Sequence, residues 1–75
     1  MQRYKNLGGN SGVVAYELGD NSIKIQFRNG SLYLYDDQST GSNDIEHMKK
    51  LAISGQGLSS FISRNVKERY AAKLK

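Results

Sequence analysis

The stretch "SIKIQFRNGSLYLYDD", residues 22–37, carries the pattern that decides the fold. On both sides of Asn29-Gly30, every second side chain is apolar, as in strands that bury one face. An Asn-Gly pair between two such runs favours a two-residue type I′ turn, because both central residues of that turn need a positive φ. The stretch therefore predicts a β-hairpin centred on Asn29-Gly30.

The two-residue turn also predicts which side chains share a face of the hairpin. It pairs Phe27 with Leu32. It likewise pairs Ile25 with Leu34, and we assign these four side chains to the core face. The opposite, outer face is then expected to carry an aromatic and polar set made of Lys24, Gln26, Tyr33 and Tyr35.

A third strand is expected before the hairpin. Residues 12–21, "GVVAYELGDN", show the same alternation and end in the turn Gly19-Asp20-Asn21. The pattern assigns three side chains to the core face, namely Val14, Tyr16 and Leu18, and two to the outer face, Val13 and Ala15. Together the runs predict a three-stranded antiparallel β-meander.

After "QSTGSN", residues 38–43, the spacing of apolar side chains becomes helical. Asn43 followed by Glu46 resembles a capping box and predicts where the first helix begins. Its apolar face is expected to contain Ile45, Met48, Leu51 and Ala52, and Gly55 and Gly57 are expected to end it.

A second helix is expected to run from Leu58 towards the C-terminus, with a stripe made of Leu58, Ile62, Val66, Tyr70 and Leu74. The predicted fold class is therefore α+β, with a three-stranded antiparallel meander followed by two helices packed on one face.

Residues 1–10, "MQRYKNLGGN", are polar and contain two glycines, so we expect a flexible arm followed by a single domain over residues 11–75. A chain of 75 residues buries only about 60% of its unfolded surface. It has no Cys and a single His, which excludes disulfides and predicts no metal site and no cofactor. Packing, a partner or self-association must therefore hold the domain together.

Charge is unevenly distributed along the chain. Basic and acidic residues balance over residues 1–40, so the net charge of +4 comes from residues 41–75. Segregated positive charge attracts polyanions, and it also keeps proteins soluble. No apolar segment approaches the roughly 20 residues that span a bilayer, and the first residues lack the apolar run of a signal peptide. We expect a soluble, cytoplasmic protein without a membrane partner.

The order of several residues resembles a known family. The pattern is Ile23-x-Ile25-x-Phe27-x-x-Gly30-x-x-Tyr33-x-Tyr35, followed by Ala52-x-Ser54, Gly57, Phe61-Ile62, Val66 and Tyr70. Over roughly residues 11–71 it is similar to the KTSC domain, a small module found at the C-terminus of some lysyl-tRNA synthetases and as a stand-alone protein. The chain lacks the family's usual Val-Pro after the Tyr-x-Tyr strand, and Ser63 stands where the family has Asn. The resemblance implies proximity to RNA and carries over no catalytic residue.

The residues do not predict an enzyme. No spacing typical of a Ser–His–acid or Cys–His site occurs, and His47 on a helix is interpreted as a surface or packing residue. Ser54-Gly55-Gln56-Gly57 lacks the Lys-Ser/Thr of a phosphate loop and is interpreted as a helix stop. The free N–H groups of the helix start after it offer an alternative site for a small nucleotide.

We expect a binding module for RNA or another nucleic acid. Bases are expected to stack on Tyr33 and Tyr35 beside Lys24, and phosphates to be attracted by a basic set made of Arg64, Lys67, Arg69 and Lys73. Plainer interpretations stay open, because tyrosines favour strands anyway and a basic helix face is commonly just solvated. The main alternative is a protein-interaction or inhibitory module of a mobile element. It would contact a protein partner or a second copy through an outer face made of Val13, Ala15, Tyr33 and Tyr35.

Overall fold

The computed structural model describes residues 1–9 and 11–75. It is an α+β fold built on one antiparallel sheet with the strand order β1-β2-β3-β4-β5. The strands are β1 (Gln2–Arg3), β2 (Val13–Leu18), β3 (Ser22–Phe27), β4 (Leu32–Asp36) and β5 (Ala72–Lys73). The helices are α1 (Asp37–Thr40), α2 (Ser42–Ser54), α3 (Leu58–Phe61) and the π-helix η1 (Ile62–Val66) that continues α3.

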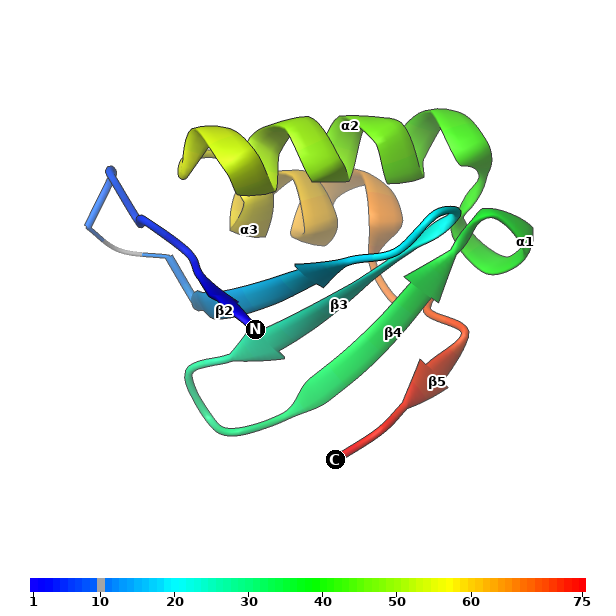
Figure 1. Ribbon diagram of the computed structural model, residues 1–75, viewed down its shortest axis with the longest axis horizontal. Helices are drawn as coiled ribbons and strands as arrows, with labels where there is room; N and C mark the ends of the chain where they lie inside the picture. Colours follow the sequence, from blue (N-terminus) through cyan, green and yellow to red (C-terminus); the bar gives the residue numbers. More distant parts are fainter. Residues whose placement is uncertain (10) are drawn as a thin grey trace.

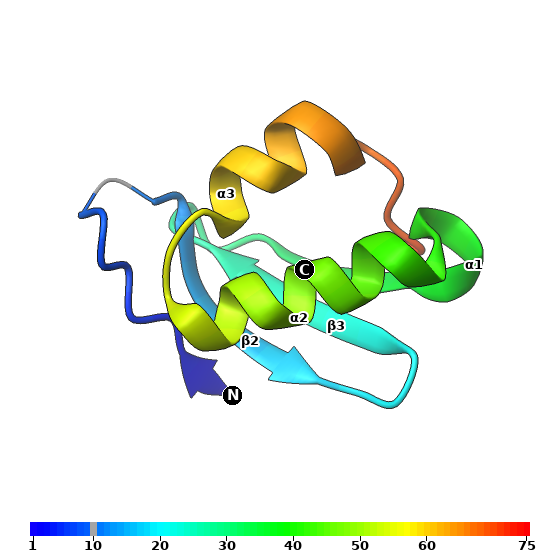
Figure 2. The same cartoon turned by 90° about the horizontal axis from the view of Figure 1, so that it is seen from above.

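Helices α2 and α3 lie on the same side of the sheet, and the strands form a layer below them (Figure 1). Seen from above, the two helices run side by side across the strands (Figure 2). The core between these layers is apolar, and its completely buried members include Ile23, Ile25, Met48, Leu58 and Val66. Helices packed on one face of an antiparallel sheet confirm the predicted α+β class. None of the described helices is both long and apolar enough to cross a membrane.

The sheet has five strands rather than three, because both chain ends add a short strand. Gln2 pairs with Tyr16 and Arg3 with Ala15. Tyr4 then enters the core with 3% of its surface exposed, and its hydroxyl accepts a hydrogen bond from the Leu58 N–H at 3.2 Å. Residues 2–4 of the expected flexible arm are therefore paired with β2 or packed in the core, and Asn10 lies outside the described residues. A two-residue strand is too short to show a period in the sequence.

The register of the β3–β4 hairpin differs by one residue from the prediction. Tyr33 lies opposite Ile25 and Tyr35 opposite Ile23. The loop has three residues, since Phe27 N–H donates to the Ser31 carbonyl at 2.8 Å and Gly30 N–H to the Phe27 carbonyl at 2.9 Å.

Within this loop only Gly30 has a positive φ, at 92°, as in a type I turn followed by a left-handed residue. A one-residue slip moves every side chain of β4 to the other face. Tyr33 and Tyr35 therefore face the helices, while Leu32 and Leu34 take the outer face, and the predicted assignment of these four is wrong.

A bulge changes the faces of β2. Val13 lies opposite Phe27 and Ala15 opposite Gln26, so one extra residue is inserted between them. Val13 and Tyr16 are consequently both buried, whereas Val14 is exposed. Tyr16 confirms the predicted core face and Ala15 the outer face. Leu18 lies on the core face opposite Ile23, as predicted, but is 43% exposed at the end of the strand. The core position predicted for Val14 and the outer position predicted for Val13 are wrong.

Helix α2 buries Ile45, Met48 and Ala52, as the spacing predicts, and ends at Gly55 in a left-handed conformation. The predicted Asn43–Glu46 capping box is absent, because the N-cap is Gly41 without a side-chain hydrogen bond. The capping box of this chain opens α1 instead, where the Asp36 carboxylate accepts from Ser39 N–H at 2.8 Å. This hydrogen bond, together with one that involves the Ser39 hydroxyl, lowers the pKa of Asp36.

The second predicted helix ends at Val66 and does not reach the C-terminus. Leu58, Ile62 and Val66 are buried as expected, but a stripe with a spacing of four drifts by about 40° per step on an α-helix. The last helical residues adopt π-helical geometry, and Lys67 then turns the chain back with φ 53° and ψ −120°. The tail pairs with β4, so the predicted helical positions of Tyr70 and Leu74 are wrong.

Candidate functional site

A groove opens at the hairpin end of β3 and β4 and encloses about 400 Å³. We call it the hairpin groove and define it by its lining residues, Gly12, Phe27, Arg28, Asn29, Ser31 and Tyr33. Phe27 and Tyr33 project from adjacent strands, are partly buried, and pack against the core. Their rings meet edge to face, with centres 5.5 Å apart and planes at 77°.

Aromatic side chains from the tail and from β4 support Tyr33. The Tyr33 and Tyr70 ring centres are 4.7 Å apart, and the Tyr70 ring contacts Tyr35 edge to face at 6.2 Å. Tyr35 is only 2% exposed, and its burial, with a smaller effect of Tyr33 and Tyr70, raises its pKa to about 12. Tyr35 is therefore part of the core and offers no ring face to a ligand. Tyr33 keeps partial access.

Two cations lie beside the aromatic pair of the groove. The Arg28 guanidinium donates to the Ser11 carbonyl at 2.9 Å, which fixes its position and leaves further N–H donors for a ligand. The Lys73 ammonium lies 5.9 Å from the centre of the Tyr33 ring. Among the described residues that line the groove, none is acidic. The groove therefore combines exposed aromatic surface with uncompensated positive charge.

The strand register separates charges along the sheet. The half next to the β2–β3 turn, which we call the acidic end, carries Glu17, Asp20 and Asp36. The half next to the β3–β4 hairpin, which we call the basic end, carries Arg3, Arg28 and Lys73. Two cations also lie at the acidic end. The Lys24 ammonium is 3.5 Å from the Glu17 carboxylate, and the Lys49 ammonium of α2 donates to the Gly19 and Asp20 carbonyls at 2.7 and 2.8 Å from the helix side of the sheet. The hairpin groove lies at the basic end, where a polyanion is attracted.

The structure does not bring the predicted binding residues together. Lys24 lies on the outer face, as expected, but Tyr33 and Tyr35 lie on the other face, so the stacking platform expected from these three is wrong. Only Tyr33 and Lys73 of the predicted set meet at the hairpin groove.

Arg69 ties the tail to the helices. Its guanidinium donates to the Thr40 carbonyl and to Asp44 Oδ2, each at 2.7 Å, and to the Asn65 carbonyl at 2.6 Å. The Thr40 hydroxyl donates back to the Arg69 carbonyl at 2.6 Å. Arg69 is thus committed to intramolecular contacts. Arg64 and Lys67 are exposed, but they lie on η1 and at its C-cap, within a few residues of Arg69 and away from the groove lining.

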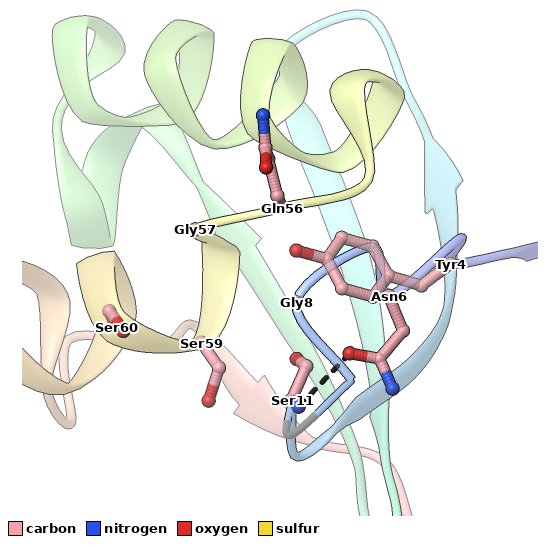
Figure 3. A pocket seen from close by; sticks show the side chains of 8 residues that line it. All are labelled: Tyr4, Asn6, Gly8, Ser11, Gln56, Gly57, Ser59 and Ser60. Atoms are coloured by element: carbon pink, nitrogen blue, oxygen red, sulfur yellow. Dashed lines mark hydrogen bonds between the residues drawn. The ribbon is translucent and has the colours of Figure 1, made fainter.

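A second pocket, of about 200 Å³, lies between the N-terminal segment and the start of α3 (Figure 3). It is lined by Tyr4, Asn6, Gly8, Ser11, Gln56, Gly57, Ser59 and Ser60. The Asn6 side chain accepts from Ser11 N–H at 3.0 Å across this pocket. It includes the glycine-rich turn considered for small-nucleotide capture, but the described lining residues carry no charge.

The described part of the chain contains no group of three or more His, Cys, Asp or Glu side chains that could hold a metal ion. His47 packs against Phe61, with ring centres 4.5 Å apart, as expected of a packing residue.

Sequence reasoning missed Phe27 and Ser31 as groove residues. The sequence signal that could have identified them is Gly30, because a three-residue loop with one left-handed glycine fits "RNG" as well as a two-residue turn does.

Comparisons with protein-family models, curated proteins and solved structures found no match to this chain. The resemblance to the KTSC domain therefore stays a prediction.

Proposed function

We propose that this protein is a non-enzymatic module of the cytoplasm that binds single-stranded nucleic acid, with RNA as its ligand. The observation that carries this proposal is the hairpin groove, where Phe27 and Tyr33 offer aromatic surface beside Arg28 and Lys73. Stacking a base on such a side chain contributes about 1–3 kcal/mol, and this contribution depends little on base identity.

The basic end supports the phosphate part of the proposal. Arg28 and Lys73 flank the aromatic pair, and Lys75 follows at the end of the tail, where its carbonyl accepts from Leu32 N–H at 3.1 Å. A strand entering the groove would place its phosphates near these cations, and it would release counterions on binding. The resemblance to a domain of lysyl-tRNA synthetases favours RNA over DNA as the ligand.

Fluorescence anisotropy with labelled single-stranded RNA, tRNA and duplex DNA at two salt concentrations tests the proposal. We expect single strands to bind best and affinity to fall with salt. Tyr33→Leu should weaken binding about tenfold through lost stacking. Arg28→Ala should weaken it and reduce the salt slope by about 1.

Two variants serve as matched controls. Phe61→Leu removes a partly buried ring that packs on His47 outside the groove, and Lys50→Ala removes an exposed charge on α2. Both should retain more affinity than the corresponding groove variants. If folded Tyr33→Leu and Arg28→Ala bind single strands as the unmodified protein does, the hairpin groove is not the binding site.

A protein-interaction or inhibitory module acting through the outer sheet face stays the alternative. Three side chains expected on that face, Val13, Tyr33 and Tyr35, point to the helices instead. Ala15 lies on the outer face as expected, and Leu32 and Leu34 lie there beside it. Absence of nucleic-acid binding at low salt, together with a complex that resists high salt, would favour this alternative.

A further inference from the structure

The outer face of the sheet is apolar over β4 and β5. Both helices of the upper layer lie on the opposite side, and none of the described helices crosses this face (Figures 1 and 2). Leu32 and Leu34 project from β4, and Ala72 lies opposite Leu34 on β5. Leu74, which is 46% exposed, follows Ala72 by two positions and continues the same face.

Over residues 32–35 the sequence of β4 carries large, mainly apolar side chains on both faces. Its core of "LYLY", residues 32–35, directs tyrosines to the helices and leucines outwards. An antiparallel strand with one solvated face normally alternates apolar and polar side chains, and a run without polar positions is typical of strands covered on both sides. The chain is short and has no cysteines, so covering this face would add apolar burial that its small core lacks.

The separation of charge along the sheet indicates what covers the face. Two copies can stack their outer faces around a two-fold axis with like ends together or with opposite ends together. Like ends would bring Asp20 and Asp36 towards the same residues of the second copy, which is repulsive. Opposite ends place them over the basic end of the second copy, where Arg3 shares the outer face with Ala15, and the same attraction recurs at the other end of the interface.

We propose that the outer face docks on the outer face of a second copy of this chain, with the acidic end of each sheet over the basic end of the other. Leu34 lies opposite Lys24 and Leu32 opposite Gln26, two positions along the strand. A two-fold axis between them lays Leu34 of one copy over Leu32 of the other. The sheets would pack face to face about 10 Å apart.

This dimer leaves the hairpin grooves open. Phe27 and Tyr33 project to the helix side of the sheet, away from the proposed interface. Lys24 and Glu17 lie at the side of the apolar patch, and their ion pair within each copy compensates both charges. Each dimer therefore presents two grooves.

Analytical ultracentrifugation over a range of concentrations tests the interface. The unmodified protein should sediment as a concentration-dependent dimer. Leu34→Lys should raise the dissociation constant at least about tenfold, because it buries an unpaired ammonium against apolar side chains. Ile53→Lys is the matched control, because Ile53 is an apolar residue of α2 that is 56% exposed, and it should dimerise as the unmodified protein does. A protein that stays monomeric up to about 1 mM, or a folded Leu34→Lys that dimerises normally, overturns the proposal.

Distances between spin labels test how the two copies are oriented in the dimer, and they require no substitution among the apolar residues of the interface. The chain has no cysteine, so Asn21→Cys in the exposed β2–β3 turn gives a unique attachment site. Opposite ends together predict two labels at least about 20 Å apart, the length of a six-residue strand. Labels in close contact would mean that like ends meet, and absence of any dipolar coupling would mean that the dimer does not form; either result refutes the proposal.

Discussion

Lys67 shows how one residue ends the second helix. It has φ 53° and ψ −120°, a combination that side chains with a Cβ rarely adopt, and its N–H donates to the Ile62 carbonyl. Strain of this kind costs about 1–3 kcal/mol and persists only where surrounding contacts hold it. The Arg69 contacts with Thr40 and Asp44 fix the chain two residues later and so maintain the turn.

Replacing Lys67 by glycine should relieve this strain. Lys67→Gly is expected to raise the free energy of unfolding by about 1 kcal/mol, after allowance for the greater flexibility of glycine in the unfolded chain. Urea denaturation measures the change, and Lys67→Ala is the control because it removes the charge but keeps the Cβ. A glycine variant no more stable than the alanine variant would contradict the assigned strain.

Tyr35 predicts a pH dependence of stability. Its pKa is raised from 10.0 to about 12 in the folded chain, mainly by burial. Above pH 10 the unfolded chain loses this proton while the folded chain retains it, so the stabilisation is complete below pH 10 and is lost as the pH rises towards 12.

Urea denaturation midpoints measured between pH 9 and pH 11 should therefore fall more steeply for the unmodified protein than for Tyr35→Phe. Other groups that titrate in this range act in both proteins, so only the difference between the two profiles reports on Tyr35. Parallel profiles would show that Tyr35 ionises as readily in the folded state as in the unfolded one.

At the scale of elements, the β3–β4 loop decides which face of the sheet becomes functional. A two-residue type I′ turn needs positive φ at both Asn29 and Gly30, whereas the observed three-residue loop needs it only at Gly30. The observed loop shifts β4 by one residue, and this shift brings Tyr33 next to Phe27 in the hairpin groove. The candidate site therefore depends on a single turn geometry.

Substitutions in the loop distinguish the two geometries. Gly30→Ala should cost about 1–2 kcal/mol of unfolding free energy because alanine is strained at this φ of 92°. Asn29→Ala should cost less, since it removes only the exposed hydrogen bond that Asn29 accepts from Ser31 N–H. Thermal denaturation gives the stabilities, and a nuclear Overhauser effect between Ile25 and Tyr33 reports the register directly. A contact between Ile25 and Leu34 as the directly opposed pair would contradict this register.

At the scale of the whole molecule, the net charge of a segment does not show which of its cations are available to a ligand. The basic excess comes from residues 41–75, yet Arg69 there holds the tail in place by hydrogen bonds to Thr40, Asp44 and Asn65. The cations that meet at the hairpin groove come from both halves of the chain, Arg28 from the loop and Lys73 from the tail. Both proposals, a nucleic-acid groove and a dimer with opposite ends together, rest on this placement of charge.

The sequence by itself determined the features that depend on neighbouring residues. Period two identified the three central strands, and helical spacing identified α2 and the buried positions Leu58, Ile62 and Val66. Tyr33 and Lys73 were predicted to bind on two other surfaces, an outer sheet face and a helix, and they meet at the hairpin groove only through the strand register. Such patterns are local, because the strand and helix repeats follow from backbone geometry alone.

Only the tertiary structure decided the register of the hairpin, the two outer strands and the path of the tail. Each depends on a contact between distant residues, such as Tyr4 with Leu58 or Arg69 with Thr40, that no local pattern encodes. Register is especially sensitive, because a slip by one residue leaves the apolar pattern of "LYLY" intact while exchanging its two faces. Packing beneath α2 and α3 therefore selects the tyrosine face for the core, and this choice places the groove on one side of the sheet and the apolar outer face on the other.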